Sequence, residues 1–171
     1  MSDGVTIDAC VMRAFMEEFL ANIKGTTRIL VEEVAAGTGL AIDQGGKIKH
    51  EWLTTCQNPY FHEWYAAQVY QGRIRELTPI IPEQHKKALL RIGLPPDGFD
   101  KVYIAVANNT KTRYIVSHDM DFFDPKLKKG DEQAKCRARD DRRGELCCYL
   151  RREMNIRVGT AVHAYAELLA H

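Results

Sequence analysis

The chain has almost no net charge, no CxxC cysteine spacing and no long apolar run. Its 24 basic residues are nearly balanced by 23 acidic residues, for a formal net charge of +1. Composition alone therefore does not indicate nucleic-acid binding, and a positive surface would have to come from local clustering. The five cysteines are an odd number, which favours reduced thiols in a cytoplasmic protein over a disulfide scaffold. Because no apolar stretch reaches membrane-spanning length, we expect a soluble protein without a membrane partner.

What the chain does have is an ordinary globular composition. Hydrophobic residues make up 45% and charged residues 27% of its 171 residues, enough to bury a substantial core. The first ten residues look like folded core and not like a secretory segment. Repeats, low-complexity tracts and linkers are not found in the sequence. We therefore predict one domain over residues 1–171.

Short apolar runs alternate with patterns of helical spacing. The runs at residues 5–8, 40–43, 113–117 and 155–159 are typical of buried strands. Such an alternation predicts an α/β domain with a mostly parallel central sheet. Helices are expected between these strands, over residues 11–23, 27–36, 47–56, 60–74, 82–92, 101–108 and 145–154, and a terminal helix is expected over residues 161–170.

Two segments are predicted to lie outside regular structure. Residues 95–98 contain two prolines and a glycine, which is a strong loop signal. Residues 124–143 carry eight Lys/Arg against five Asp/Glu, and we expect them to form a charged, exposed loop or an irregular insertion.

Two aspartates directly follow predicted strands. Asp8 ends the first strand, and Asp119 lies two residues past the strand over residues 113–117. In open α/β sheets, ligands bind outside the carboxyl ends of the strands, where the strand order reverses. Asp8 and Asp119 are therefore predicted to converge at one edge of the sheet. For either aspartate alone an Asx turn or a helix cap is the alternative explanation, and it accounts less well for the pair.

Two further acids stand at the starts of predicted helices. Asp100 precedes an apolar helix as an N-cap residue would, although a carboxylate held there can also face a cavity. Glu51 follows a glycine turn on the first turn of a helix, where the helix dipole favours a negative charge in any case. Glu32 and Glu33 compete with Glu51 for the same role, but adjacent acids are typical of a solvated helix face.

Together these carboxylates form an all-oxygen set of ligands without a histidine or thiol beside them. Such a set suits Mg²⁺ or Mn²⁺ and not zinc. Two such ions, about 3.5–4 Å apart, can activate water and stabilise both oxygens of an in-line phosphodiester displacement. The sequence therefore predicts a catalytic cluster made of Asp8, Glu51, Asp100 and Asp119.

Several segments resemble the PIN-domain nucleases, and they occur in the order of that family. Residues 98–107 resemble its acid-led helix of small apolar residues, and residues 113–122 resemble its strand and Thr/Ser-x-Asp-x-Asp-Phe turn. Residues 5–11 look like its first strand, acid and helix entry. Residues 43–52 look like the strand–turn–helix that carries the second acid in one PIN-like branch. Residues 156–160 are similar to the family's last strand, so the resemblance spans nearly the whole chain, although each motif is short and degenerate.

The resemblance implies a three-layer α/β/α PIN-like fold. It also implies a Mg²⁺- or Mn²⁺-dependent endoribonuclease that cleaves single-stranded or structured RNA, with DNA as the alternative substrate. Small stand-alone PIN proteins are often toxins of toxin–antitoxin pairs. A toxin with an inhibitory antitoxin as its partner, or a defence nuclease, is therefore expected, as is assembly into a homo-oligomer.

The resemblance also assigns roles to individual residues. Asp8, Asp100 and Asp119 would hold the metal ions together with the auxiliary acid Asp121, and Ser117 would support them by hydrogen bonding. The family commonly has Asn or Ser two residues after the first acid, where this chain has a cysteine. Because a thiol is a poor hydrogen-bond partner, this substitution predicts a changed orientation of the first acid and reduced activity. The supporting residues are thus Ser117 and Cys10.

Basic side chains near the acids are candidates for contacts with nucleic-acid phosphates. Two of them directly precede Glu51, and two lie at or before the start of the strand that leads to Asp119. A histidine lies directly before Asp119. A structural role is the alternative for the histidine. These candidates are Lys49, His50, Lys111, Arg113 and His118.

Two other functions are compatible with the same residues. Residues 115–121 also resemble the strand and Asp-x-Asp signature of haloacid-dehalogenase phosphatases, in which the first aspartate is a nucleophile. That family has Thr or Val where Phe123 stands here, and its signature usually lies near the start of the chain. The other alternative is a non-catalytic PIN-like module that binds RNA or a protein.

Overall fold

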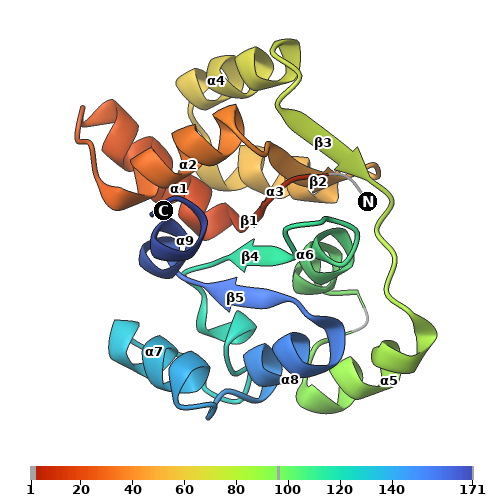
Figure 1. Ribbon diagram of the computed structural model, residues 1–171. Helices are drawn as coiled ribbons and strands as arrows, with labels where there is room; N and C mark the ends of the chain where they lie inside the picture. The colour runs from red at the N-terminus through yellow and green to blue at the C-terminus, as the bar shows by residue number, and fades with distance from the viewer. Residues whose placement is uncertain (1–2, 96, 171) are drawn as a thin grey trace.

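Parallel strands and helices alternate along the chain in a computed structural model that describes residues 3–95 and 97–170 (Figure 1). The predicted mixed α/β architecture with parallel strands is confirmed. The elements are β1 (Thr6–Ile7), α1 (Ala9–Leu20), α2 (Thr26–Ala36), β2 (Leu40–Asp43), α3 (Lys47–Cys56), α4 (Pro59–Tyr70), β3 (Ile74–Leu77), α5 (Glu83–Ile92), α6 (Phe99–Ala107), β4 (Tyr114–Val116), the 3₁₀ helix η1 (Met120–Phe122), α7 (Glu132–Asp140), α8 (Glu145–Met154), β5 (Arg157–Gly159) and α9 (Ala161–Leu168).

The strands form two parallel groups joined at the start of β1. One group has the order β1-β4-β5 and the other pairs β2 with β3. A parallel bridge between Val5 and Leu40 connects them, because the Val5 N–H donates to the Gly39 carbonyl at 3.0 Å and the Ala41 N–H donates to the Val5 carbonyl at 2.9 Å. The spatial order is therefore β3-β2-β1-β4-β5. The direction of winding reverses between β1 and β4, where α/β sheets bind ligands.

Helices pack along these strands and carry most of the core. α6 packs against β1, β2 and β4, α3 against β2, and both α8 and α9 against β5, while α1 contacts α2 and α3. Buried side chains from Val5 to Ala164 form one hydrophobic cluster. The fully buried Trp52 of α3 donates its indole N–H to the Ile7 carbonyl at 2.9 Å, which fixes α3 against the end of β1. A three-layer arrangement and a PIN-like fold stay predictions.

Two elements differ from the sequence-based expectation. The helix predicted over residues 60–74 ends at Tyr70, and after Gly72, which has a φ of 66°, the chain forms β3 beside β2. The segment predicted to be a loop at 124–143 contains helix α7. The Asp131 carboxylate caps it by accepting the Ala134 N–H at 2.8 Å. Of the loop predicted at 95–98, Pro96 lies outside the described residues.

Candidate active site

Asp8 lies at the carboxyl end of β1 and begins α1. Its Oδ1 accepts the Ala9 N–H at 2.8 Å, and its Oδ2 accepts the Ser117 hydroxyl at 2.7 Å and the Cys10 thiol at 2.9 Å. Burial raises the pKa of Asp8, although the three hydrogen bonds act in the opposite direction. The Cys10 thiol thus contacts the carboxylate directly, and the changed orientation and reduced activity expected from this cysteine stay predictions.

Asp119 is joined to Asp8 through one hydroxyl group. The Asp119 N–H donates to Ser117 Oγ at 2.9 Å, and that hydroxyl donates in turn to Asp8. The Asp119 carboxylate is exposed and caps η1, with Oδ1 accepting the Asp121 N–H at 3.2 Å. The structure therefore brings Asp8 and Asp119 to the same edge, at the point between β1 and β4 where the strand order reverses.

Asp100 faces this edge from the first turn of α6. The N-cap of α6 is Gly98, so the alternative explanation of Asp100 as the cap of this helix is wrong. Burial is the main cause that raises the pKa of Asp100 to about 7, and negative charges on Asp8, Asp119 and Asp121 raise it further. The Asp100 carboxylate makes no hydrogen bond with the other residues that the structure describes.

Glu51 approaches the same group from α3. The sequence analysis predicted Glu51 on the first turn of its helix. Because α3 begins at Lys47, Glu51 lies on the second turn instead. Its Oε2 accepts the Tyr103 hydroxyl at 2.7 Å. Burial raises the pKa of Glu51, and the charges of Asp8 and Asp119 add to the effect.

The acids thus form a cluster whose members repel one another. The neighbouring charges that act most strongly on Asp100 are all carboxylates. Burial, followed by the Asp119 charge, also raises the pKa of Asp121. Carboxylates that raise the pKa values of one another in this way are typical of a site that a divalent ion neutralises.

The donor set of this cluster fits hydrated Mg²⁺ or Mn²⁺. Within the described residues, no three of these acids bring ligand atoms within 4.8 Å of one another. Mg²⁺ usually keeps several waters and takes only one or two protein carboxylates, with substrate phosphates completing its shell. The described acids therefore do not form a closed cage of protein ligands, and Mg²⁺ or Mn²⁺ held by them would need further oxygen ligands from water or substrate.

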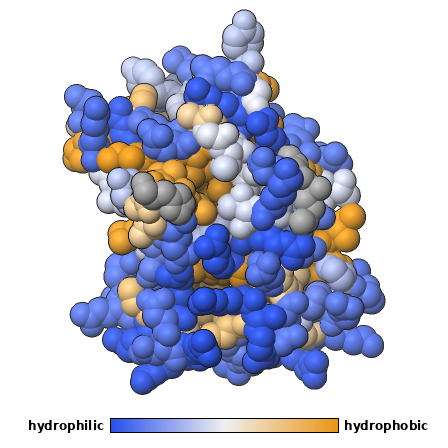
Figure 2. Space-filling model, viewed as in Figure 1, coloured by the Kyte–Doolittle hydropathy of each residue, from blue (hydrophilic) through white to orange (hydrophobic). Residues whose placement is uncertain are grey.

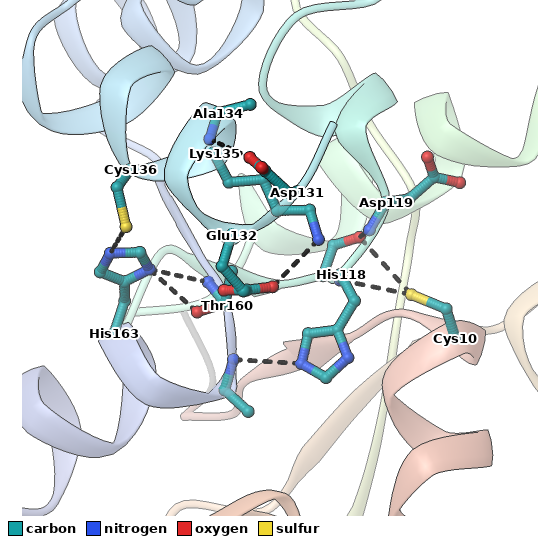
Figure 3. A network of polar contacts seen from close by, with 12 residues as sticks. Cys10, His118, Asp119, Asp131, Glu132, Ala134, Lys135, Cys136, Thr160 and His163 are labelled. Atoms are coloured by element: carbon teal, nitrogen blue, oxygen red, sulfur yellow. Dashed lines mark hydrogen bonds and ion pairs between the residues drawn. The ribbon is translucent and has the colours of Figure 1, made fainter. Parts of the chain in front are cut away.

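The ligand atoms of a second group, made of Cys136, Asp140 and His163, do lie within 4.8 Å of one another. The hydrogen bonds of its histidine argue against a bound metal. In this group, His163 Nε2 lies 3.6 Å from Cys136 Sγ (Figure 3), and it lies 3.8 Å from Asp140 Oδ2. The other ring nitrogen accepts the Thr160 N–H at 3.2 Å, as part of the capping box of α9. A histidine that accepts through Nδ1 carries its proton on Nε2 when neutral, so no lone pair faces the cysteine and aspartate.

An open cleft of about 700 Å³ lies beside the acid cluster. Cys10, His118 and Asp119 form one wall (Figure 3). Arg13 of α1 lines it as well, and Lys128 and Lys129 line it from the segment before α7. Three basic side chains therefore border an opening that leads to Asp119.

The predicted phosphate-binding residues are dispersed. The Lys49 ammonium lies 5.4 Å from the centre of the Tyr65 ring, and His50 lines a separate pocket of about 290 Å³. Lys111 and Arg113 precede β4. They therefore lie at the amino end of that strand, away from the edge where Asp119 follows it.

His118 lines the cleft but is held by the backbone. Its ring Nε2 accepts the backbone N–H of Ala161 at 3.4 Å, and its backbone N–H donates to Cys10 Sγ at 3.3 Å. Burial is the main cause that lowers its pKa. Because a lowered pKa favours the neutral ring, these contacts support the structural alternative for this histidine.

Sequence reasoning missed several residues of the site. Tyr103 lies three positions after Asp100, and this spacing places both residues on one face of a helix. The sequence therefore contained a signal for Tyr103 that was not used. Arg13 likewise follows Cys10 by three positions. Lys128 and Lys129 carry no such local signal, because their position depends on how the segment before α7 folds back over the cleft.

Comparison with family models, with curated proteins and with solved structures found no match. The resemblance to PIN-domain nucleases therefore rests on the residues quoted above and stays a prediction. Within the described part of the chain, none of the helices is both long and apolar enough to span a membrane.

Proposed function

We propose that this protein is a metal-dependent nuclease with a PIN-like, three-layer fold, and that RNA is its substrate. The observation that carries the proposal is the meeting of Asp8, Glu51, Asp100 and Asp119 at the strand-order reversal, where their mutual repulsion contributes to raising the pKa of Asp100 to about 7. Carboxylates at this position of an α/β sheet are ligands of the type that metal-dependent phosphodiester hydrolysis uses.

The Asp8 carboxylate has its orientation fixed by hydrogen bonds and keeps one acceptor position. An ionised carboxylate offers about four lone-pair positions, and three hydrogen bonds to Ala9, Cys10 and Ser117 occupy three of those on Asp8. These bonds fix the orientation of Asp8. The carboxyl of Asp100 must lose its proton before it can act as a ligand.

Mg²⁺ or Mn²⁺, when bound, would activate a water molecule and neutralise charge on the scissile phosphate. Arg13, Lys128 and Lys129 line the adjoining cleft, and we assign them to phosphates on either side of the cleavage point. Contacts of this kind hold the backbone without reading its sequence. An inhibitory protein that covers the cleft would fit a toxin–antitoxin pair.

Cleavage of labelled single-stranded RNA and DNA in Mn²⁺, Mg²⁺ or EDTA tests the proposal. We expect metal-dependent cleavage of RNA that falls at least about a hundredfold in Asp119→Asn, since a lost ligand removes transition-state stabilisation. Glu63→Gln, an exposed acid on α4, is the charge-matched control and should cleave normally.

Three outcomes would contradict the proposal. Cleavage that survives both EDTA and Asp119→Asn would show that the acid cluster is not the catalytic centre. RNA binding without cleavage in any metal would favour the non-catalytic module. Release of phosphate from p-nitrophenyl phosphate, abolished by Asp119→Asn and without RNA cleavage, would favour the phosphatase alternative.

A further inference from the structure

A second pocket, of about 350 Å³, lies between the end of α7, the outer face of α8 and β5. Its lining contains five arginines and no acid. An adjoining pocket of about 580 Å³ shares two of these arginines and adds Arg91 and Arg143. None of these residues lines the cleft beside Asp119. We call the five lining arginines the arginine pocket: Arg139, Arg142, Arg151, Arg152 and Arg157.

The concentration of charge in this region contrasts with the balance of the whole chain. The two adjoining pockets hold seven of the thirteen arginines in a protein with a formal net charge of only +1. In Figure 2 the surface over α7 and α8 is largely hydrophilic. The five arginines all lie between residues 139 and 157, in α7, the α7–α8 connection, α8 and β5, and the folding of this stretch brings them around one pocket.

Two members of the arginine pocket are held in fixed positions by one acid. Arg139 and Arg157 both pair with Glu167 of α9, the second with a separation of 3.4 Å between Nη1 and Oε2. The Arg157 guanidinium also lies 5.1 Å from the centre of the Tyr114 ring. Arg139 also pairs with Asp140 at 3.4 Å between Nη1 and Oδ1, so the charges of Arg139 and Arg157 are matched by two carboxylates and these arginines mainly shape the pocket.

The remaining charge in the pocket is only partly compensated. Arg152 pairs with Glu153, whereas Arg142 and Arg151 are exposed and make no ion pair with the other described residues. Burial is the main cause that raises the pKa of the Cys147 thiol to about 12. That thiol therefore stays neutral and does not reduce the positive potential.

We propose that the arginine pocket binds a di- or triphosphate group. Guanidinium groups bind phosphate oxygens through paired N–H donors. Arg142 and Arg151, which make no ion pair with the other described residues, offer such donors beside the three paired arginines. A free nucleotide and the 5′ end of an RNA can both supply this group. The proposal does not rest on the proposed nuclease activity, because the two sites share no lining residue.

Binding measurements in EDTA test this proposal separately from cleavage. Inorganic tripolyphosphate is the first probe, titrated into wild type, Arg142→Gln and Arg151→Gln. We expect the dissociation constant to rise at least about tenfold in each variant, because each change removes a charged donor. Arg137→Gln is the matched control, since Arg137 is also exposed on α7 but lines neither pocket.

Two further probes distinguish the sources of the group. Stronger binding of 5′-triphosphate RNA than of the same RNA with a 5′-hydroxyl, lost in Arg151→Gln, would assign the pocket to RNA ends. Competition by ATP with no preference between the two RNAs would assign it to nucleotides. Absence of tripolyphosphate binding, or equal losses in Arg137→Gln and the pocket variants, would overturn the proposal, provided that thermal unfolding shows all variants to be folded.

Discussion

Asp100 holds its proton in a pH range in which an exposed aspartate is ionised, because it is partly buried among other acids. Such a carboxyl binds its proton more tightly in the folded chain than in the unfolded chain. Its contribution to stability is therefore complete below the unfolded pKa of about 4, and it is lost as the pH rises through about 7.

We accordingly predict that, in EDTA, the free energy of unfolding falls by on the order of 2 kcal/mol between pH 4 and pH 8 through this residue. In Asp100→Asn that decline should be smaller by this amount, as measured by urea denaturation across the pH range. Asp97→Asn, an exposed aspartate in the preceding loop, is the control. An identical pH dependence in Asp100→Asn and wild type would contradict the assignment.

Ser117 is fully buried and connects two acids through one hydroxyl. We predict that Ser117→Ala lowers the rate of metal-dependent RNA cleavage by about ten- to a hundredfold, since Asp8 and Asp119 lose their common partner. Thr54→Ala, which removes an exposed hydroxyl from α3, should leave the rate unchanged. An unaltered rate in Ser117→Ala, with normal unfolding behaviour, would remove Ser117 from the site.

At the scale of elements, α3 is fixed to β1 by the indole of Trp52. Its N–H donates to the Ile7 carbonyl, one residue before Asp8, and Glu51 precedes Trp52 on the same helix. Two of the proposed acids are therefore positioned through one buried hydrogen bond between elements.

We predict that Trp52→Phe lowers the free energy of unfolding by about 2–4 kcal/mol, because the Ile7 carbonyl loses its side-chain donor and the smaller ring leaves a cavity. Trp64→Phe, which affects a half-buried indole packed on Phe15, should cost less. Urea denaturation of both variants measures the difference, and equal losses would contradict the role given to the hydrogen bond.

Helix α7 lies in the segment 124–143, which the sequence analysis predicted to be a loop or irregular insertion. Its sequence is highly polar, yet Lys135 and Ala138 are buried and Asp131 caps its first turn. The capping residue and the favourable charges at the helix ends were visible in the sequence. The buried contacts with α8 that stabilise so polar a helix were not.

At the scale of the molecule, the site depends on strand order. β1 and β4 are separated by more than a hundred residues, yet they are adjacent at the reversal of winding. Because four elements contribute acids to one edge, an ion bound there joins distant parts of the chain. Binding to the folded state alone then raises global stability.

We therefore predict that Mn²⁺ at a hundred times its dissociation constant stabilises the protein by about 2.7 kcal/mol. The thermal unfolding midpoint should rise with Mn²⁺, return to its starting value on addition of EDTA, and respond far less in Asp119→Asn. Asp141→Asn, an exposed aspartate at the end of α7, is the control. An equal rise in wild type and Asp119→Asn would place the bound ion elsewhere.

The sequence by itself determined most local structure and the position of the acids relative to strands. Apolar runs and helical spacing predicted β1, β2, β4 and β5 and most helices, because these signals depend on neighbouring residues. It did not predict β3, whose residues are only partly buried and become a strand by pairing with β2.

Only the tertiary structure decided which of the candidate residues lie together. It placed Glu51 and Asp100 against Asp8, separated Lys111 from Asp119, and folded two lysines from the late charged segment over the cleft. It also brought five arginines of residues 139–157 around one pocket. The physical reason is that convergence depends on strand order and helix packing, which arise from contacts between residues far apart in the chain.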